Sequence, residues 1–311
     1  MRIKNIEIGL GEVKRIDVNI AKLPSHTPID IPITIARGKK PGPVLLLMGG
    51  LHGDEINGIE IVRRIIEKDL HIPSKGTVIC IPILNIYGFI HFTRYVPDGK
   101  DINRSFPGNK NGSLASRVAH FMMKDIIPQI DYGVDFHTGG ADRTNYPQIR
   151  CMYNDSVNAE LADAFCAPFT MHSAYRSKSL RQSAAKLGKK ILVYEAGESS
   201  RFDEHAIQLG IDGTIRLMNH LGMSKRKVSK PKYKNQFIRK SSWIRAQVSG
   251  IFQSEVNQGD RVTKKQTVGY ITDPFGDYKK SIKSPSDGFV IGLNNDPILH
   301  QGDAVMHIGV V

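Results

Sequence analysis

The first two thirds of the chain contain continuous apolar runs, most of which end directly in polar or glycine-rich fragments. The runs lie at Pro43–Gly50, Thr77–Asn85, Gly133–His137 and Lys190–Ser199. Runs of this kind are typical of central strands that are buried on both faces of a sheet. Segments with apolar residues near helical spacing lie between and after them. Strands that alternate with helices predict an α/β domain with a mixed, largely parallel sheet flanked by helices.

Four segments have the spacing of helices. They are the residues from Ile56 to Ile66 and the segments 113–127, 156–167 and 203–221. Ser113 is a candidate N-cap, because its hydroxyl can accept a hydrogen bond from a free backbone N–H of the first turn. Before the first apolar run, residues Ile6–Ile35 alternate apolar and polar side chains around Pro and Gly breaks, which predicts antiparallel strands.

Beyond about Lys240 the pattern changes to short strand-like segments separated by turn residues. The similar turns NQGDRV and HQGDAV, around Gly259 and Gly302, indicate an internal duplication. No long helix is readable there, so we expect a small all-β unit. The expected division is an α/β domain over residues 1–224, a linker over 225–240 and a C-terminal β domain over 241–311.

The formal net charge of the chain is +13, and much of the excess lies in the expected linker. Residues 213–254 contain no Asp or Glu, while the stretch 225–240 holds eight Lys and Arg residues. We interpret this stretch as a solvated basic segment, with an anionic partner as the alternative. No nucleic-acid-binding motif accompanies it, so nucleic acid is not an expected partner.

The cysteines and the apolar segments bear on the compartment. The three cysteines, Cys80, Cys151 and Cys166, form no C-x-x-C pair, and an odd number gives no disulfide framework. The N-terminal residues lack the apolar segment of a signal peptide, and the longest apolar stretch, around Val44–Met48, is too short to span a bilayer. We therefore expect a cytoplasmic protein with no membrane partner.

Four polar fragments carry the residues with catalytic chemistry. They are GGLHGDE at Gly49–Glu55, DINRSFPG at Asp101–Gly108, DFHTGG at Asp135–Gly140 and YEAGES at Tyr194–Ser199. His52, Glu55 and His137 offer three ligands for one zinc ion and leave a fourth coordination position for water. These residues fall where predicted strands end, which is where open α/β sheets bind ligands. Asp54 and Asp135 are candidates to orient a ligand histidine through its second ring nitrogen.

Hydrolysis of an amide at such a metal needs a base that takes a proton from water and returns it to the leaving nitrogen. Glu195 fits this role, because it follows the apolar residues Ile191–Tyr194 and is not needed as a ligand. An apolar environment raises the pKa of a carboxylate, which favours such a base. Glu198, farther into the turn, is the local competitor.

Three arginines and one asparagine are candidates for contact with the substrate. Asn103 and Arg104 are adjacent in DINRSFPG, and a guanidinium matches the planar geometry of a substrate carboxylate. Arg94 is a second candidate for the carboxylate, or for the oxyanion that develops on the scissile carbonyl. Arg181, upstream of Glu195, is a candidate to bind the acyl part of the substrate.

Other chemistries lack their sequence signatures. The glycine-rich fragments do not have the arrangement of a nucleotide-binding loop. Ser105 and Ser199 do not lie in the context of a nucleophile elbow, which argues against covalent serine catalysis. The remaining histidines are expected to be surface or structural residues, among them His91, His120, His172 and His205.

The four fragments, in this order, resemble the motifs of the succinylglutamate desuccinylase/aspartoacylase family, which has a zinc carboxypeptidase-like fold. The resemblance covers about Pro41–Ser199. It implies one zinc per chain held by His52, Glu55 and His137, a general base at Glu195, carboxylate contacts from Asn103 and Arg104, and an oxyanion or carbonyl contact from Arg94.

The C-terminal stretch resembles the small β domain of deacylase-like members of this family, which implies a barrel-sandwich, lipoyl-like character. It lacks an attachment lysine in an M-K-M context, so a swinging-arm carrier is not expected. The resemblance instead implies a domain that covers the opening of the active site or mediates formation of a homo-oligomer.

The function predicted from these observations is zinc-dependent removal of an acyl group from a small N-acyl amino acid or related amide. The acyl group and the amino acid are left open. A zinc metallocarboxypeptidase that acts on peptides is an alternative, because it would use the same metal site. A binding or adaptor protein with an inactive catalytic domain is a third reading, which the intact set His52, Glu55, His137 and Glu195 opposes.

Overall fold

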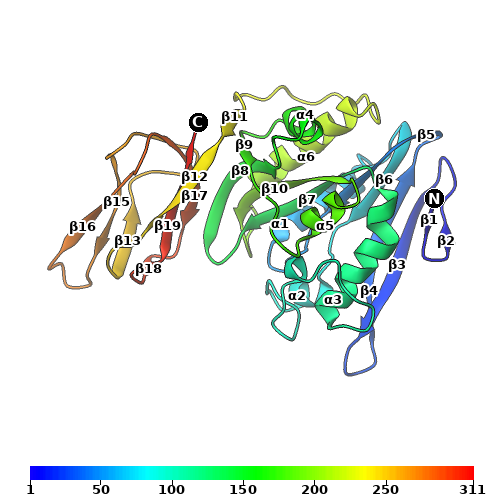
Figure 1. Cartoon of the computed structure of the whole chain (residues 1–311), viewed down its shortest axis with the longest axis horizontal. Helices are drawn as coiled ribbons and strands as arrows, with labels where there is room; N and C mark the ends of the chain where they lie inside the picture. Colours follow the sequence, from blue (N-terminus) through cyan, green and yellow to red (C-terminus); the bar gives the residue numbers. More distant parts are fainter.

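The computed structural model describes residues 1–311 and shows a larger α/β part and a smaller, all-strand C-terminal part (Figure 1). The mixed α/β fold of the larger part agrees with the alternation of strand and helix patterns in the sequence. One sheet runs through both parts, because strands of the C-terminal part pair with the sheet of the larger part.

The larger part contains ten strands, six α-helices and three short helical turns. Its strands are β1 (Arg2–Ile3), β2 (Ile6–Glu7), β3 (Val13–Lys22), β4 (Pro28–Arg37), β5 (Lys40–Met48), β6 (Lys75–Ile81), β7 (Tyr132–Gly139), β8 (Arg143–Cys151), β9 (Phe169–His172) and β10 (Lys190–Glu198). Its helices are α1 (Ile56–Glu67), α2 (Ile86–Ile90), α3 (Leu114–Phe121), α4 (Ser156–Phe165), α5 (Leu180–Ala185) and α6 (Glu204–His220). The turns are η1 (Ile102–Arg104), η2 (Met122–Ile126) and η3 (Ile127–Gln129).

The centre of the sheet consists of parallel strands in the order β10-β7-β5-β6. On one side β4 and β3 extend it antiparallel, and on the other side β8 pairs antiparallel with β10. The carboxyl ends of the parallel strands therefore lie along one edge, which is the usual place for a ligand site in sheets of this kind.

The central strands are apolar without interruption because both faces of the sheet are covered. In β5, Leu45 and Leu47 pack into the core beneath α1, α4 and α6. The alternate residues Leu46 and Met48 pack into a second core that includes side chains of α3 and α5. Both sets are buried, so a polar residue on a central strand would have to find a partner within the protein.

The predicted helices are present, although one of them changes its geometry along its length. Ser113 caps α3 by accepting from the backbone N–H of Ser116. The single helix expected over residues 113–127 is α-helical only to Phe121 and continues as the π-helical turn η2 and the 3-10 turn η3. The proline at position 128 lacks a backbone N–H, which opposes continuation of the helix there.

Strands β8 and β9 were not predicted. The sequence of β8, RTNYPQIRC, contains Pro147 and several polar residues, and it has neither a continuous apolar run nor a regular alternation. The strand nevertheless pairs with β10 on one side and with β9 and β17 on the other. Its polar residues therefore lie close to the strand that carries Glu195.

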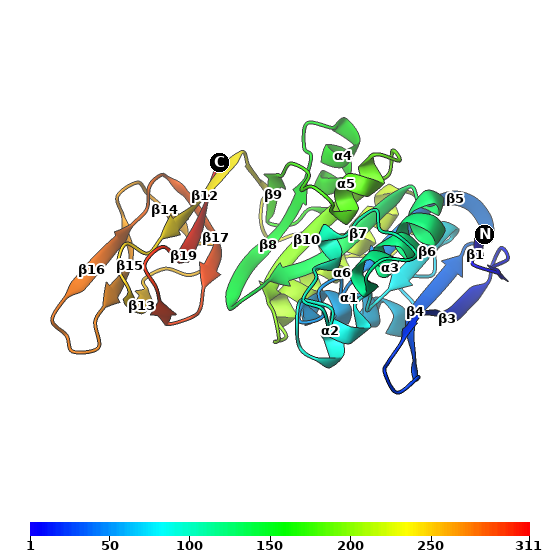
Figure 2. The same cartoon turned by 60° about the horizontal axis from the view of Figure 1, so that its bottom comes forward.

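The C-terminal part consists of nine short strands. They are β11 (Gln236–Ile238), β12 (Lys240–Arg245), β13 (Gly250–Ser254), β14 (Arg261–Val262), β15 (Thr267–Thr272), β16 (Lys279–Lys283), β17 (Gly288–Asn294), β18 (Ile298–Leu299) and β19 (Ala304–Val310). The order β12-β19-β17-β8 continues the large sheet, while β16-β15-β13-β18 form a second sheet (Figure 2).

The two similar turns of the C-terminal part have the same hydrogen bonds. Asp260 accepts from the backbone N–H of Asn257, and Asp303 accepts from that of His300. Gly259 has a φ of +89° and Gly302 a φ of +95°, a region that glycine adopts at little cost. The two copies of the motif therefore fold alike, as their sequences indicate.

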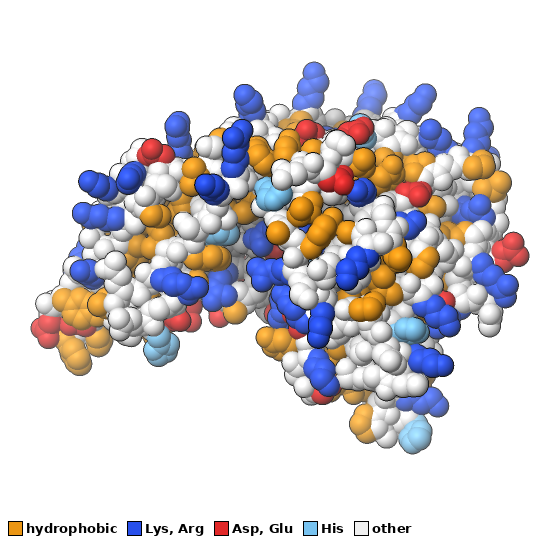
Figure 3. All heavy atoms as spheres, viewed as in Figure 1, with side chains coloured by type: hydrophobic (Ala, Val, Ile, Leu, Met, Phe, Trp, Pro, Cys, Tyr) orange, Lys and Arg blue, Asp and Glu red, His pale blue; other side chains and the backbone are white.

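The basic segment between α6 and β11 lies along one edge of the molecule, where its side chains project into solvent (Figures 1 and 3). The segment is hydrogen-bonded to the larger part of the molecule. Arg226 donates to the carbonyl oxygens of Asp69 and Ile72, and Tyr233 donates to that of Cys166. Near the end of the basic stretch 225–240, β11 pairs with β9. No helix is long and apolar enough to cross a membrane.

Candidate active site

Residues from three neighbouring strands meet at the carboxyl edge of the parallel sheet. His52 and Glu55 lie in the loop between β5 and α1, His137 lies near the end of β7, and Glu195 lies near the end of β10. Gly50 gives the loop a turn with a φ of +59°. Gly53 lets it pass against the backbone of α2, since a Cβ there would lie 1.9 Å from the carbonyl carbon of Gly88.

Glu55 is the centre of the site and is only 2% exposed. Its Oε1 lies 2.7 Å from His52 Nδ1 and accepts from Arg94 Nη1 at 3.2 Å. Its Oε2 lies 2.8 Å from His137 Nδ1 and accepts from the backbone N–H of Thr138 at 3.1 Å. Both carboxylate oxygens are therefore held, which fixes the two imidazoles around one point.

The charges of this cluster stabilise one another. Burial would raise the pKa of Glu55, but the charges and hydrogen bonds of His52 and His137 outweigh burial and hold that pKa well below its ordinary value. Burial would lower the pKa of His137, but Asp135 and Glu55 raise it well above its ordinary value. For His52, burial is likewise outweighed, by Glu55 and Asp101, and its pKa is raised.

Each histidine also has a carboxylate at its second ring nitrogen. Asp135 Oδ2 lies 2.8 Å from His137 Nε2, as the sequence predicted, although the contact does not have the geometry of a hydrogen bond. Asp101 Oδ1 lies 3.3 Å from His52 Nε2. Asp54, the other residue proposed for this role, has a buried Oδ1 without a hydrogen-bond partner. The orienting carboxylate at His52 is therefore Asp101.

The donor set fits a zinc ion. His52, Glu55 and His137 offer ligand atoms that all lie within 4.8 Å of one another, and all three residues are buried. Two imidazoles and one carboxylate form a set of three protein ligands that is common in catalytic zinc sites. Carboxylates beside the second ring nitrogens are the outer contacts that metal-binding histidines usually have.

Glu195 lies beside this cluster without belonging to it. It is the register partner of His137 on the neighbouring parallel strand, so the two side chains project from the same face of the sheet. Glu195 Oε2 accepts from Asn145 Nδ2 at 2.8 Å, and its Oε1 lies 3.6 Å from Arg150 Nη1. One oxygen is therefore held by a hydrogen bond, while the other has only a long ionic contact.

Arg94 connects the cluster with the DINRSFPG fragment. Besides its bond to Glu55, it donates from Nε and Nη2 to Asp101 Oδ2 at 3.1 and 2.9 Å. The side chain is 29% exposed, so it reaches the surface of the site. Because Asp101 also contacts His52, the two fragments form one hydrogen-bonded unit.

The other candidates for substrate contact lie on two segments that touch each other. Asn103 Oδ1 accepts from the backbone N–H of Leu180, at the start of α5. Arg104 is exposed and donates to the carbonyl oxygen of Asn103 without a carboxylate partner. Arg181 donates to the carbonyl oxygens of Arg150 and Ala174 and to Ser173 Oγ. The backbone of β8 and the residues that follow β9 thus hold the guanidinium of Arg181.

Three residues of the site were missed as site residues in the sequence. Asp101 opens the DINRSFPG fragment, so its position in the motif was an available signal. Asn145 and Arg150 contact Glu195 from β8, a strand that the sequence pattern did not predict. Strand β8 pairs with β10 through backbone hydrogen bonds, which no local side-chain pattern in the sequence predicts.

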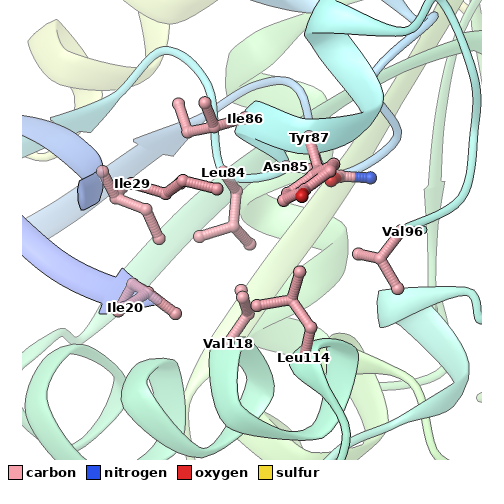
Figure 4. Close-up of a pocket in the computed structure, with 10 residues that line it drawn as sticks. Ile20, Ile29, Leu84, Asn85, Ile86, Tyr87, Val96, Leu114 and Val118 are labelled. Atoms are coloured by element: carbon pink, nitrogen blue, oxygen red, sulfur yellow. The ribbon is translucent and has the colours of Figure 1, made fainter. Parts of the chain in front are cut away.

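An apolar cavity lies below the segment that contains α2 (Figure 4). Side chains of β3, β4 and α3 point into it, including Ile20, Ile29 and Val118. Its volume is about 20 Å³, which is room for about one water molecule. The cavity is therefore a packing defect and not a pocket for a substrate.

Comparison with known proteins agrees with the geometry. Residues 41–221 match the succinylglutamate desuccinylase/aspartoacylase catalytic domain. The chain belongs to this family. The family resemblance inferred from the four fragments is thereby confirmed, and so is the predicted class of enzyme, a hydrolase that acts on amide bonds.

Proteins with solved structures share the fold over the whole chain. A succinylglutamate desuccinylase/aspartoacylase from Rhodobacter sphaeroides is 24% identical, with a TM-score of 0.85, covering 99% of this chain and 98% of that one. The ectoine utilization protein EutE from Ruegeria pomeroyi, in a product-bound structure, is 21% identical, with a TM-score of 0.85, covering 98% and 97%.

A relative of described activity is the N-alpha-acetyl-L-2,4-diaminobutyric acid deacetylase from Halomonas elongata. It is 25% identical over 294 residues, which cover 90% of this chain and 86% of the relative. The likeness includes the C-terminal part as well as the family domain, because the family domain ends at residue 221.

Proposed function

We propose that this chain is a zinc-dependent amidohydrolase that removes the acyl group from a small N-acyl amino acid. The observation that carries the proposal is the position of Glu195, one strand away from His137 in a cluster of two histidines and a glutamate. This arrangement separates a residue that can move protons from the residues that can hold a metal. The activity named for the Halomonas relative supports the substrate class.

His52, Glu55 and His137 would hold the zinc. When bound, the metal would polarise the scissile carbonyl and lower the pKa of a water molecule toward neutrality. Glu195 takes a proton from the attacking water and delivers it to the nitrogen that leaves as the C–N bond breaks. Asn145 holds Oε2 of Glu195 in place, so Oε1 is the oxygen we assign to the transfer of the proton.

The remaining polar residues bind the substrate in this proposal. Arg94 lies against Glu55 and faces the site with its exposed edge, so it stabilises the charge that develops on the carbonyl oxygen. Arg104 has no carboxylate partner within the chain, which leaves its guanidinium free for the carboxylate of the substrate. Asn103 fixes the segment that carries Arg104, and Arg181 is assigned to the acyl part.

Basic side chains border the indentation between the two parts of the molecule (Figure 3). This charge favours an anionic substrate such as an N-acyl amino acid. We also propose the domain division into a catalytic domain over 1–224, a basic segment over 225–240 and a β domain of barrel-sandwich character over 241–311. The continuous pairing from β12 to β8 makes that β domain an extension of the catalytic sheet.

The test combines metal analysis with a substrate screen. Protein purified without added metal should contain about one zinc per chain, and His52→Ala should contain none, while the exposed His26→Ala serves as the control. The wild-type chain should hydrolyse members of a panel of N-acyl amino acids. Hydrolysis of peptides in preference to this panel would favour a metallocarboxypeptidase. A chain that takes up no zinc would refute the proposal.

A further inference from the structure

A second buried carboxylate, three residues beyond the proposed base, ties β10 to the C-terminal part. Glu198 is 5% exposed. Its Oε2 accepts from Asn295 Nδ2 at 2.6 Å and from Thr144 Oγ1 at 3.2 Å. Asn295 also donates to Thr144 Oγ1, and its backbone N–H donates to the carbonyl oxygen of Asp142. Two segments, residues 142–144 and the turn that contains Asn295, therefore meet at the carboxylate of β10.

Between Glu195 and Glu198, strand β10 contains an irregularity. Glu195 pairs with His137 and Glu198 pairs with Gly139, so three steps on β10 correspond to two steps on β7. The extra residue forms a bulge, in which Gly197 has a φ of +76°. Bulges next to active sites re-aim the side chains that flank them, and here the bulge follows the proposed base directly.

The segment after the bulge also holds both metal-binding loops. The backbone N–H of Ser199 donates to the carbonyl oxygen of Gly139, and that of Ser200 donates to the carbonyl oxygen of Asp54 at 2.8 Å. A shift of this segment would therefore change the distance between Glu195 and the ligands on either side. Glu198 is the side chain that fixes the segment from the side of the C-terminal part.

We propose that Glu198 and Asn295 are positioning residues, whose hydrogen bond lets the C-terminal part hold the β10 bulge and so place Glu195 against the metal site. The inference rests on the proposed function, because it assigns Glu195 a role in catalysis. A hydrogen bond to an ionised carboxylate is among the stronger ones in a protein. Its loss would leave Glu198 buried without its shortest partner.

Exchanging the carboxylate and the amide between positions 198 and 295 tests this hydrogen bond. Asn295→Asp places two carboxylates together and therefore loses the bond. Glu198→Gln keeps a hydrogen bond from Asn295 Nδ2 to the amide oxygen of residue 198 and loses only the charge of the acceptor. The double variant Glu198→Gln with Asn295→Asp restores a bond to a carboxylate in the reverse direction, from the amide of residue 198 to the carboxylate of residue 295. Asn257→Asp makes the same charge change on an exposed turn of the C-terminal part and is the control.

We expect Asn295→Asp to lower kcat about tenfold to a hundredfold, because misplacing a reacting group by about 1 Å costs up to that factor. Glu198→Gln should lower kcat less, because it keeps a weaker, neutral hydrogen bond. KM should change far less, and the zinc content should stay at the wild-type level. The double variant should recover most of the lost kcat. Wild-type kcat in Asn295→Asp, or a double variant no better than Asn295→Asp, would overturn the proposal.

Amide hydrogen exchange distinguishes a failure of this proposal from a failure of the proposed function. In Asn295→Asp the backbone amides of residues 195–203 should exchange faster than in the wild type, and in the double variant they should return toward the wild-type rate. If the wild-type chain hydrolyses no N-acyl amino acid, the proposed function fails by itself. Unchanged exchange in Asn295→Asp would overturn the positioning role whatever the activity.

Discussion

Glu195 of β10 and His137 of β7 face the same side of the sheet as register partners on adjacent parallel strands. Neighbouring strands lie about 4.8 Å apart, so the two residues are as close as two strands can place them. Glu195 makes its hydrogen bond to Asn145 and none to the three candidate metal ligands. The carboxylate proposed to transfer protons thus lies beside the candidate metal site, while the set of candidate ligands is complete without it.

Replacing Glu195 with Gln should abolish turnover and leave the metal in place. The amide keeps the size of the side chain and can still contact Asn145, but it cannot accept the proton of the attacking water. Loss of a general base typically costs about 10²–10⁴ in rate. Steady-state kinetics and elemental analysis of the same preparation measure both effects.

The control for this variant is Glu255→Gln, which changes an exposed glutamate of the C-terminal part. It should have wild-type activity and zinc content. A Glu195→Gln protein that retains turnover would show that another residue, or water alone, moves the proton. Loss of zinc in that variant would instead place Glu195 among the residues that support the metal.

Arg94→Met should reduce kcat/KM without removing zinc. Arg94 bonds to Glu55 at 3.2 Å and to Asp101 at 2.9 Å, but it is not one of the three clustered ligands. Loss of one group that stabilises an oxyanion typically costs about 10²–10³ in kcat. Arg94→Lys should recover only part of the activity, because an ammonium cannot contact both carboxylates with the same geometry.

The exposed Arg15→Met is a matched control for Arg94→Met, since Arg15 lies on the edge strand β3 and has only a 4.0 Å contact to Asp17. It should leave both kcat and KM unchanged. If Arg94→Met proved fully active, the developing negative charge would have to be stabilised by other groups.

The sequence predicted the parts of the site that short local patterns encode. His52 and Glu55 follow one buried strand, and His137 and Glu195 end two others, so the apolar runs located them. Each of these strands is apolar because both faces of the sheet are covered, and this burial is what makes the pattern readable. The sequence therefore located the candidate ligands and the candidate base from strand ends.

The contacts between distant segments could not be predicted in the same way. Strand β8 combines Pro147 with polar side chains, among them Asn145, which donates to Glu195, and the strand also pairs with β17 of the C-terminal part. The joining of β17 to β8 depends on backbone hydrogen bonds, which no side-chain pattern specifies. The sequence therefore indicates Glu198 as a competitor of Glu195 for the role of base, whereas in the structure its carboxylate accepts a hydrogen bond from Asn295.

Stability should depend on the ion pairs of Glu60 on α1 in a pH-dependent way. Hydrogen bonds from Arg63, against the effect of burial and with help from Arg64, lower the pKa of Glu60 from 4.5 to about 2. A lowered carboxylate pKa stabilises the folded state above pH 4.5, and this contribution disappears as the pH falls toward 2. The arginines are partly exposed and screened by solvent, so we expect about 1–2 kcal/mol at neutral pH.

Urea unfolding of Glu60→Gln and the wild type between pH 3 and 7 measures this contribution. The difference in the free energy of unfolding should be largest at pH 7 and fall by more than half at pH 3. Glu67→Gln, on the same helix, removes only the exposed ion pair with Arg63. It should change the free energy of unfolding by less than about 0.5 kcal/mol. A difference that is constant with pH would contradict the assignment.

Gly53→Ala should destabilise the protein and weaken metal binding together. A Cβ at this position would lie 1.9 Å from the carbonyl carbon of Gly88 and 2.1 Å from the nitrogen of Phe89, so backbone would have to move. Overpacking of this kind costs about 1–3 kcal/mol. Because His52 and Glu55 flank Gly53, the zinc content should fall as well. Gly9→Ala, where a Cβ meets only Glu12 at 3.5 Å, is the control for thermal unfolding.

Metal uptake should release protons near neutral pH. In the metal-free protein the pKa of His52 is raised and that of His137 is raised well above its ordinary value, so these imidazoles hold protons at a pH where free histidine is mostly neutral. An imidazole must be neutral to bind a metal, so about one to two protons should leave per zinc bound at pH 7. Since protons compete with zinc for the imidazoles, the affinity should fall as the pH falls.

Calorimetric titration of metal-free protein with zinc, in buffers of different ionisation enthalpy, measures the number of protons released. Asp135→Asn should lower that number. Asp135 lies 2.8 Å from His137 Nε2, and its charge is the largest of the effects that raise the pKa of His137 against burial. An observed enthalpy that does not vary with the buffer would mean that the histidines are already neutral before zinc binds. In that case Glu55 would accept hydrogen bonds from two neutral imidazoles. The affinity for zinc would then be nearly constant above pH 6.5.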